Sequence, residues 1–134
     1  MKIRSVIINI NEINVLVLAY LGDNVYEYYI RKFLINKKIG SVNELQKNSI
    51  NYVSAINQSK FLLCLLEKGF FYDFEIDIIK RARNHKGTSH PKNCDIVTYK
   101  HATALEALIG YLELQGNRIR IEEIMSAILG GELC

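Results

Sequence analysis

The sequence predicts an all-α fold. Its 134 residues contain a single proline, Pro91, and apolar residues recur three and four positions apart in most windows. Alternation typical of a strand occurs convincingly only from Val6 to Ile10. These observations together favour helices joined by short turns.

The first helical segment is expected to begin at a cap provided by Asn11 or Asn14 and to end near Leu21. Gly22 interrupts the pattern there, and a second helix is predicted to continue to about Ile35. The apolar stripe of this second helix consists of Val25, Tyr29, Ile30 and Phe33.

The middle of the chain carries a recognisable helix start. Ser41 and Glu44 have the spacing of a capping box, which predicts a short helix. A longer helix follows it and ends at Glu67, because Gly69 favours termination.

The carboxyl-terminal half is predicted to contain three helices and one long loop. Asp73 caps a helix that runs to about Arg83, and residues 84–96 hold the turn-forming residues of a loop. Helix returns over residues 97–114, and Asn117 caps a last helix that ends before two glycines.

Length and composition predict one globular domain over residues 1–134, which is 49% hydrophobic and 23% charged. The longest uninterrupted apolar run, from Val15 to Leu21, is far short of the roughly 20 residues that a membrane helix needs. No targeting pattern follows Lys2 and Arg4. We therefore expect a cytoplasmic protein without a membrane partner.

The cysteines predict neither a disulfide framework nor a standard zinc site. Cys64, Cys94 and Cys134 are odd in number and widely spaced, so reduced thiols in a reducing compartment are expected, with Cys64 in the core. The residues nearest to a zinc pattern are His85, His90, Cys94 and Asp95. Their spacing matches no standard ligand set.

Positive charge is concentrated in one segment. The net charge of the chain is only +3, yet residues 80–100 hold six Lys or Arg against the single acid Asp95. Such a segment is either a solvated loop or a surface for a polyanion such as nucleic acid. The candidate nucleic-acid-binding residues are Arg81, Arg83, Lys86, Lys92 and Lys100.

Two carboxylates, Asp23 in AYLGDNVY and Glu106 in TALEALIGY, are set into apolar stretches. On a helix, neither has a Lys or Arg three or four residues away, and Glu27 adds a like charge near Asp23. A cation from elsewhere would balance both, and carboxylate oxygens suit Mg²⁺. For Asp23 alone, the alternative is an ordinary helix cap.

The surrounding residues resemble a known family. LAYLGDNVYEYYIRKFL is similar to the signature helix of ribonuclease III, and TALEALIGYLEL is similar to the second catalytic helix of that family. KRARNHKGTSHPKNCDIVTYKHATALEALIGYL resembles the compact Mini-ribonuclease III branch in its RN, PKN and TY elements. The resemblance covers residues 12–131 and implies the helical ribonuclease III endonuclease fold as a homodimer.

The resemblance also implies which residues carry the chemistry. In larger relatives the signature helix carries the pattern E-x-x-E-x-x-x-D, whose acidic positions align here with Leu16, Ala19 and Asp23. The second catalytic helix carries D-x-x-E, whose acidic positions align with Thr103 and Glu106. Only Asp23 and Glu106 keep their acids, so both are expected to be catalytic residues and ligands of Mg²⁺, or of Mn²⁺ in its place. Fewer anionic ligands predict weaker binding of the metal.

As the resemblance implies, the chain would hydrolyse double-stranded RNA to 5′-phosphate and 3′-hydroxyl ends, in maturation of large-subunit ribosomal RNA precursor. Because we expect no separate RNA-binding domain after Cys134, a ribosomal protein that presents the RNA is a candidate further partner. The alternative is a non-catalytic RNA- or ribosome-binding protein with the same fold. The expected dimer face comprises Val17, Tyr20, Val25, Tyr26 and Tyr29, and the competing explanation is that some of them are buried in the monomer core.

Overall fold

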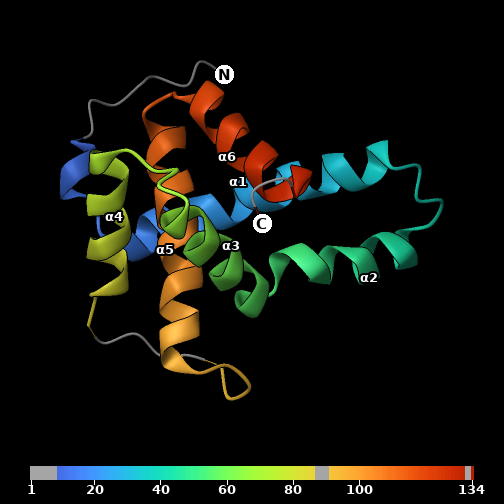
Figure 1. Cartoon of the computed structure of the whole chain (residues 1–134), viewed down its shortest axis with the longest axis horizontal. Helices are drawn as coiled ribbons and strands as arrows, with labels where there is room; N and C mark the ends of the chain where they lie inside the picture. Colours follow the sequence, from blue (N-terminus) through green and yellow to red (C-terminus); the bar gives the residue numbers. More distant parts are fainter. Residues whose placement is uncertain (1–8, 87–90, 132–133) are drawn as a thin grey trace, which may run out of the picture.

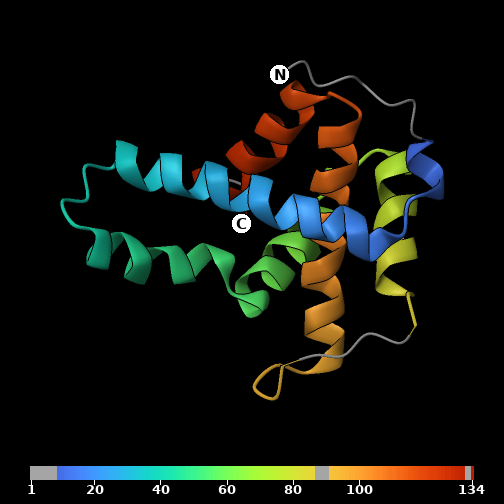
Figure 2. The ribbon, with the colours of Figure 1, turned by 180° about the vertical axis from the view of Figure 1, so that it is seen from behind.

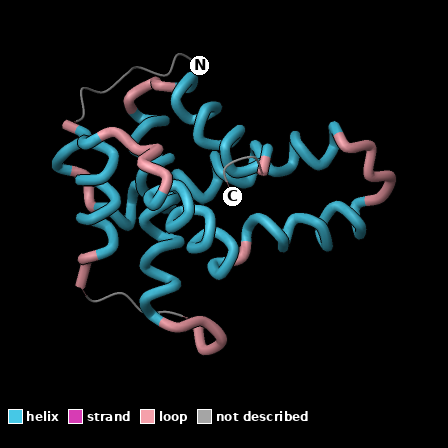
Figure 3. Tube along the Cα trace, viewed as in Figure 1, coloured by secondary structure: helices cyan, strands magenta, loops and turns pink. Residues whose placement is uncertain are grey.

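The computed structural model describes residues 9–86, 91–131 and 134 (Figure 1). All regular structure in those ranges is helical, which confirms the all-α prediction, as the tube in Figure 3 shows. The elements are a 3₁₀ turn η1 (Ile10–Glu12) and the helices α1 (Val15–Asn36), α2 (Val42–Val53), α3 (Ala55–Glu67), α4 (Asp73–Arg83), α5 (Ile96–Leu114) and α6 (Arg118–Gly130). Within the described ranges, no helix combines the length and the hydrophobicity that a membrane span requires.

Helix α1 is continuous where the sequence predicted a break. It begins after Asn14, whose side chain accepts a hydrogen bond from the backbone N–H of Leu16, and it passes through Gly22 without interruption. The prediction that Gly22 ends a helix is therefore wrong, and so is the alternative that Asp23 is a helix cap. A glycine costs about 1 kcal/mol inside a helix, so a tertiary contact is needed to explain it.

That contact is the crossing of α1 and α5, which Figures 1 and 2 show from opposite sides. A Cβ atom on Gly22 would overlap the backbone carbonyl of Glu106, and one on Gly110 would overlap the carbonyl of Leu18. The two glycines thus allow the helix backbones to touch. Helix propensity takes no account of contacts between distant segments, so the local pattern wrongly predicted a helix end at Gly22.

Helix α5 is the central element of the fold. Its residues from Ala102 to Leu112 are buried, apart from the partly buried Glu106. Helices α1, α3 and α4 pack directly against it, so its hydrophobic residues face neighbours on several sides. This packing fixes where the side chains of α1, α3 and α5 meet.

A buried ion pair joins α4 to the start of α6, away from that meeting point. Arg120 donates to both oxygens of Glu75 at 2.8 and 2.9 Å and to the carbonyl of Phe70 at 2.9 Å. Glu75 also accepts the backbone N–H of Tyr72, so Tyr72, and not the predicted Asp73, is the capping residue of α4. Both charges of this pair are hydrogen-bonded, as burial requires.

The cysteine prediction is wrong for two of the three residues. Cys64 on α3 forms a disulfide with Cys134, 70 residues away, with a Cα–Cα distance of 6.1 Å. Spacing rules did not reveal this pair because it forms only when the end of the chain lies beside α3. Cys94 is the free cysteine among the described residues, and His90 of the considered zinc set lies outside them.

Candidate active site

Asp23 and Glu106 line the same open hollow, of about 540 Å³, where α1, α3 and α5 meet. We call it the carboxylate hollow. Its walls are formed by Leu16, Ala19, Tyr20, Asp23, Val53, Ala55, Gln58, Tyr99, Ala102, Thr103 and Glu106. The two acids that the sequence left without a partner are thus brought together by the fold.

The glycine crossing is what places the two acids side by side. Asp23 follows Gly22, and the carbonyl of Glu106 lies directly against Gly22. On α1, the positions of Leu16 and Ala19 share a face with Asp23, and on α5 Thr103 shares a face with Glu106. All five positions picked out by motif comparison therefore face one hollow.

Electrostatics in the hollow favour arrival of a cation. Burial, followed by a hydrogen bond and the charge of Asp23, raises the pKa of Glu106 to about 9, and the charge of Glu27 adds to the effect. The opposing influence is a hydrogen bond from Gln58, which lowers that pKa. Glu106 therefore keeps its proton at neutral pH, and a divalent cation would take the place of that proton.

The residues present fit a metal ion that keeps most of its own ligands. Among the described residues, no group of three or more His, Cys, Asp or Glu converges on a metal position. Mg²⁺ commonly binds through one or two carboxylates and takes its remaining ligands from water and substrate phosphates. Asp23 and Glu106 supply the two carboxylates, and the open hollow has room for the water molecules and phosphate oxygens that complete the coordination.

The raised pKa of Glu106 predicts how Glu106→Gln changes stability in the presence of chelator. The folded protein retains a proton that the unfolded chain loses above the ordinary glutamate pKa of 4.5. Stability of the wild type therefore falls as pH rises from about 4.5 towards 9. We expect the melting temperature of Glu106→Gln to exceed that of the wild type by a margin that widens from pH 5 to pH 9.

Thermal denaturation at pH 5, 7 and 9 measures this margin. Glu67→Gln, which changes an exposed acid at the end of α3, is the matched control and should follow the wild type. Parallel pH profiles for Glu106→Gln and the wild type would contradict the prediction.

The candidate RNA-binding residues are spread from the end of α4 to the start of α5. Arg81 is exposed and donates to the carbonyls of Asn11 and Ile13 at 3.1 and 3.2 Å, so it also ties α4 to the segment before α1. Arg83 lies near His101, whose pKa is lowered by burial and then by the Arg83 charge. Lys86 and Lys92 are exposed, and Lys100 is half-buried.

Two polar residues of the carboxylate hollow were not assigned to the site from sequence. Tyr99 precedes Glu106 by seven positions and Thr103 by four, so helical spacing from Glu106 could have found it. Gln58 comes from α3, and no local signal connects it with Asp23 or Glu106. Only packing of α3 against α5 brings it to the site.

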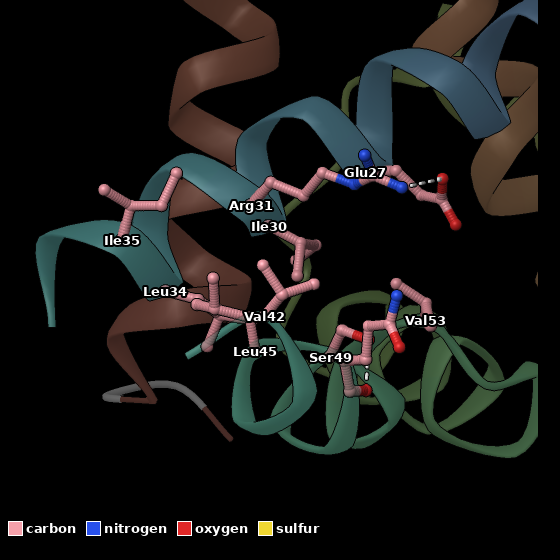
Figure 4. A pocket seen from close by; sticks show the side chains of 10 residues that line it. Glu27, Ile30, Arg31, Leu34, Ile35, Val42, Leu45, Ser49 and Val53 are labelled. Carbon is pink, nitrogen blue, oxygen red and sulfur yellow. Dashed lines mark hydrogen bonds and ion pairs between the residues drawn. The ribbon is translucent and has the colours of Figure 1, made fainter. Parts of the chain in front are cut away.

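A second hollow, of about 300 Å³, lies between α1 and α2 (Figure 4). Apolar side chains such as Ile30, Leu34 and Leu45 line it. Its acid, Glu27, faces Arg31 at 3.8 Å and so already has a partner. This hollow therefore lacks the unpaired acids that the carboxylate hollow contains.

The family profile of the ribonuclease III domain matches residues 16–117, a stretch that contains every wall residue of the carboxylate hollow. The chain belongs to the ribonuclease III family. It is therefore an endoribonuclease of the ribonuclease III family, and RNA is its substrate class.

Relatives within the ribonuclease III family cover nearly the whole chain. A protein named Mini-ribonuclease 3 from Brevibacillus brevis is 46% identical over 125 residues, which are 91% of this chain and 92% of that relative. The Mini-ribonuclease 3 of Staphylococcus aureus is 40% identical and covers 90% of each chain. A crystal structure of a Fusobacterium nucleatum protein matches with a TM-score of 0.80 and 33% identity, covering 92% of this chain and 98% of that one.

Burial divides the residues of the expected dimer face. Val17 is 56% exposed and Tyr20 84% exposed, whereas Tyr26 is fully buried and donates its hydroxyl to the carbonyl of Tyr52 at 2.6 Å. The inclusion of Tyr26 in a dimer face is therefore wrong, since its ring belongs to the core. Val25 and Tyr29 are half-buried.

Proposed function

We propose that this ribonuclease is a metal-dependent endonuclease for double-stranded RNA that leaves 5′-phosphate and 3′-hydroxyl ends. The observation that carries the proposal is the convergence of Asp23 and Glu106 in one open hollow, whose walls among the described residues include no basic side chain. Two facing acids without a cation suit a site whose positive charge is supplied by a bound metal ion.

Asp23 and Glu106 would hold Mg²⁺, with Mn²⁺ able to replace it. When bound, such an ion polarises a phosphate and lowers the pKa of a water molecule, which allows hydrolysis at neutral pH. The carboxylates bind and orient, and each must be ionised to do so. Ala19 and Thr103, where larger relatives have acids, leave space in the hollow for water and phosphate oxygens.

Cleavage of both strands favours a homodimer with two-fold symmetry. The strands of a duplex are related by local two-fold axes, so two identical sites can address one scissile bond each. Tyr20 both lines the carboxylate hollow and is the most exposed of the candidate dimer residues. A dimer face around Val17 and Tyr20 would therefore lie beside the site that it serves.

We propose large-subunit ribosomal RNA precursor as the natural substrate, processed in the cytoplasm. The support for this is the similarity to Mini-ribonuclease 3 proteins and the resemblance in the basic segment. A ribosomal protein that presents a folded RNA would compensate for the small number of basic residues near the hollow. Proteins bind duplex RNA mainly through its shape, its phosphates and its 2′-hydroxyls. A surface with few basic residues can make contacts of this kind without reading the sequence.

Incubation with a long perfect RNA duplex at low salt tests the proposed function. End-labelled duplex RNA, single-stranded RNA and duplex DNA are each incubated with Mg²⁺, with Mn²⁺ or with chelator, and the products are resolved on gels. Double-strand cuts only in RNA duplex and only with metal support the proposal. Binding without cleavage would overturn it in favour of the non-catalytic RNA-binding alternative.

The basic residues should contribute to binding in a salt-dependent manner. Replacing both Lys86 and Lys92 by Gln is expected to weaken duplex binding and to reduce the slope of log K against log salt by about one unit for each phosphate that is no longer neutralised. Filter binding in Ca²⁺ from low to moderate salt measures the slope. The control replaces the exposed Lys47 and Lys68, which lie away from this segment, and an equal effect there would contradict a specific contact surface.

A further inference from the structure

One buried polar side chain in the carboxylate hollow is not explained by metal binding through the two acids. Gln58 is only 3% exposed, although its helix α3 carries Leu62 and Leu65 at the following buried positions. A buried amide without hydrogen bonds costs free energy that a leucine would not. The side-chain amide of Gln58 therefore needs a hydrogen-bond partner inside the protein.

The backbone around Gln58 is already satisfied by the helix. Its N–H donates to the carbonyl of Ser54 at 2.9 Å, within the first turn of α3, and the Ser54 side chain caps the same turn. The α3 backbone thus fixes the position of Gln58, and its side chain is free to reach the hollow. That side chain lines the carboxylate hollow together with Glu106, and it lowers the pKa of the Glu106 carboxyl.

We infer that Gln58 is a positioning residue for the reaction, whose side-chain amide holds the carboxylate of Glu106 in the orientation that receives the divalent cation. The inference rests on the proposed function, because it assumes that Glu106 is a ligand. A carboxylate has two oxygens, and an amide bonded to one leaves the other directed at the cation. Groups that orient metal ligands in this manner affect metal affinity by about 10- to 100-fold.

Gln58→Met tests the inference, because methionine keeps the length and burial of the side chain but removes the donor. Mn²⁺ is titrated into the RNA-free protein and followed by the loss of the free-ion EPR signal, so the readout does not depend on cleavage. We expect the Mn²⁺ dissociation constant to rise by about tenfold. The melting temperature in chelator should not fall, because an apolar side chain replaces a buried amide.

Two further measurements separate positioning from a general structural role. The Mg²⁺ concentration for half-maximal cleavage should rise with Gln58→Met, whereas duplex binding in chelator should not change. Ser59→Ala is the matched control, since Ser59 is 5% exposed on the same helix but does not line the hollow. It should match the wild type in all these measurements.

The outcomes distinguish failure of the inference from failure of the proposed function. Wild-type Mn²⁺ affinity in Gln58→Met, with duplex cleavage by the wild type intact, overturns the inference alone. Weakened Mn²⁺ binding by Gln58→Met supports the inference even if the wild type cleaves no duplex, which would overturn only the proposed function. A wild type that binds no Mn²⁺ and cleaves no duplex with metal overturns both.

Discussion

Asp23→Asn is expected to abolish cleavage of duplex RNA while leaving the protein folded and able to bind RNA. Asp23 is exposed to the carboxylate hollow, and its charge is one of the two that would hold the metal. Neutralising it removes several kcal/mol of metal-dependent stabilisation, and about 4 kcal/mol corresponds to roughly a thousandfold in rate. Single-turnover cleavage at saturating protein and Mg²⁺ measures the loss.

The matched control for this variant is Asp77→Asn, the same chemical change at an exposed position on α4. It should cleave at the wild-type rate. Removal of the Asp23 charge also removes one cause of the raised pKa of Glu106, so Asp23→Asn should be no less thermostable than the wild type in chelator. Cleavage by Asp23→Asn within tenfold of the wild type would contradict a metal site at this position.

Gly22→Ala is expected to destabilise the protein strongly. Its Cβ would overlap the backbone carbonyl of Glu106, and backbone in the middle of two buried helices cannot move aside as a flexible side chain can. We expect a loss of about 3 kcal/mol or more, near the upper end for overpacked cores. Urea denaturation followed by circular dichroism measures it.

Gly40→Ala provides the control, because a Cβ at Gly40 meets nothing within 4 Å and no positive φ restrains it. That change should be neutral or stabilise by up to about 1 kcal/mol. Any Gly22→Ala protein that folds at low temperature should still cleave poorly, since α1 and α5 must separate and carry Asp23 away from Glu106. Wild-type stability of Gly22→Ala would show that the two backbones are not in contact.

The wrong prediction at Gly22 shows where reasoning from sequence failed. Within a window of helix propensity, a glycine followed by Asp and Asn is typical of a helix end and a new cap. In the fold, the same glycine lies in the middle of the 22-residue α1, where a side chain of any size would separate α1 from α5. Tertiary packing outweighed the local signal because the residues that contact Gly22 lie on α5, far along the chain and outside any local window.

In the candidate site, too, some residues could be identified from local sequence signals and others only from the packing of helices. Asp23 and Glu106 could be singled out from sequence because both lack a basic residue at helical spacing, which is a local property. Gln58 could not, since its relation to Glu106 depends on how α3 packs on α5. Tyr26 looked like surface on α1, but its hydroxyl reaches the Tyr52 carbonyl and its ring is buried.

By itself, the sequence determined the helical class, most helix ends and the two acids at the centre of the proposed chemistry. These follow from capping residues, apolar periodicity and charge spacing, all of which act within one or two turns of a helix. The tertiary structure alone decided the continuity of α1 through Gly22, the disulfide between Cys64 and Cys134, and the meeting of Asp23, Glu106 and Gln58. Each of these depends on contacts between distant segments, which only the packing of whole helices brings together.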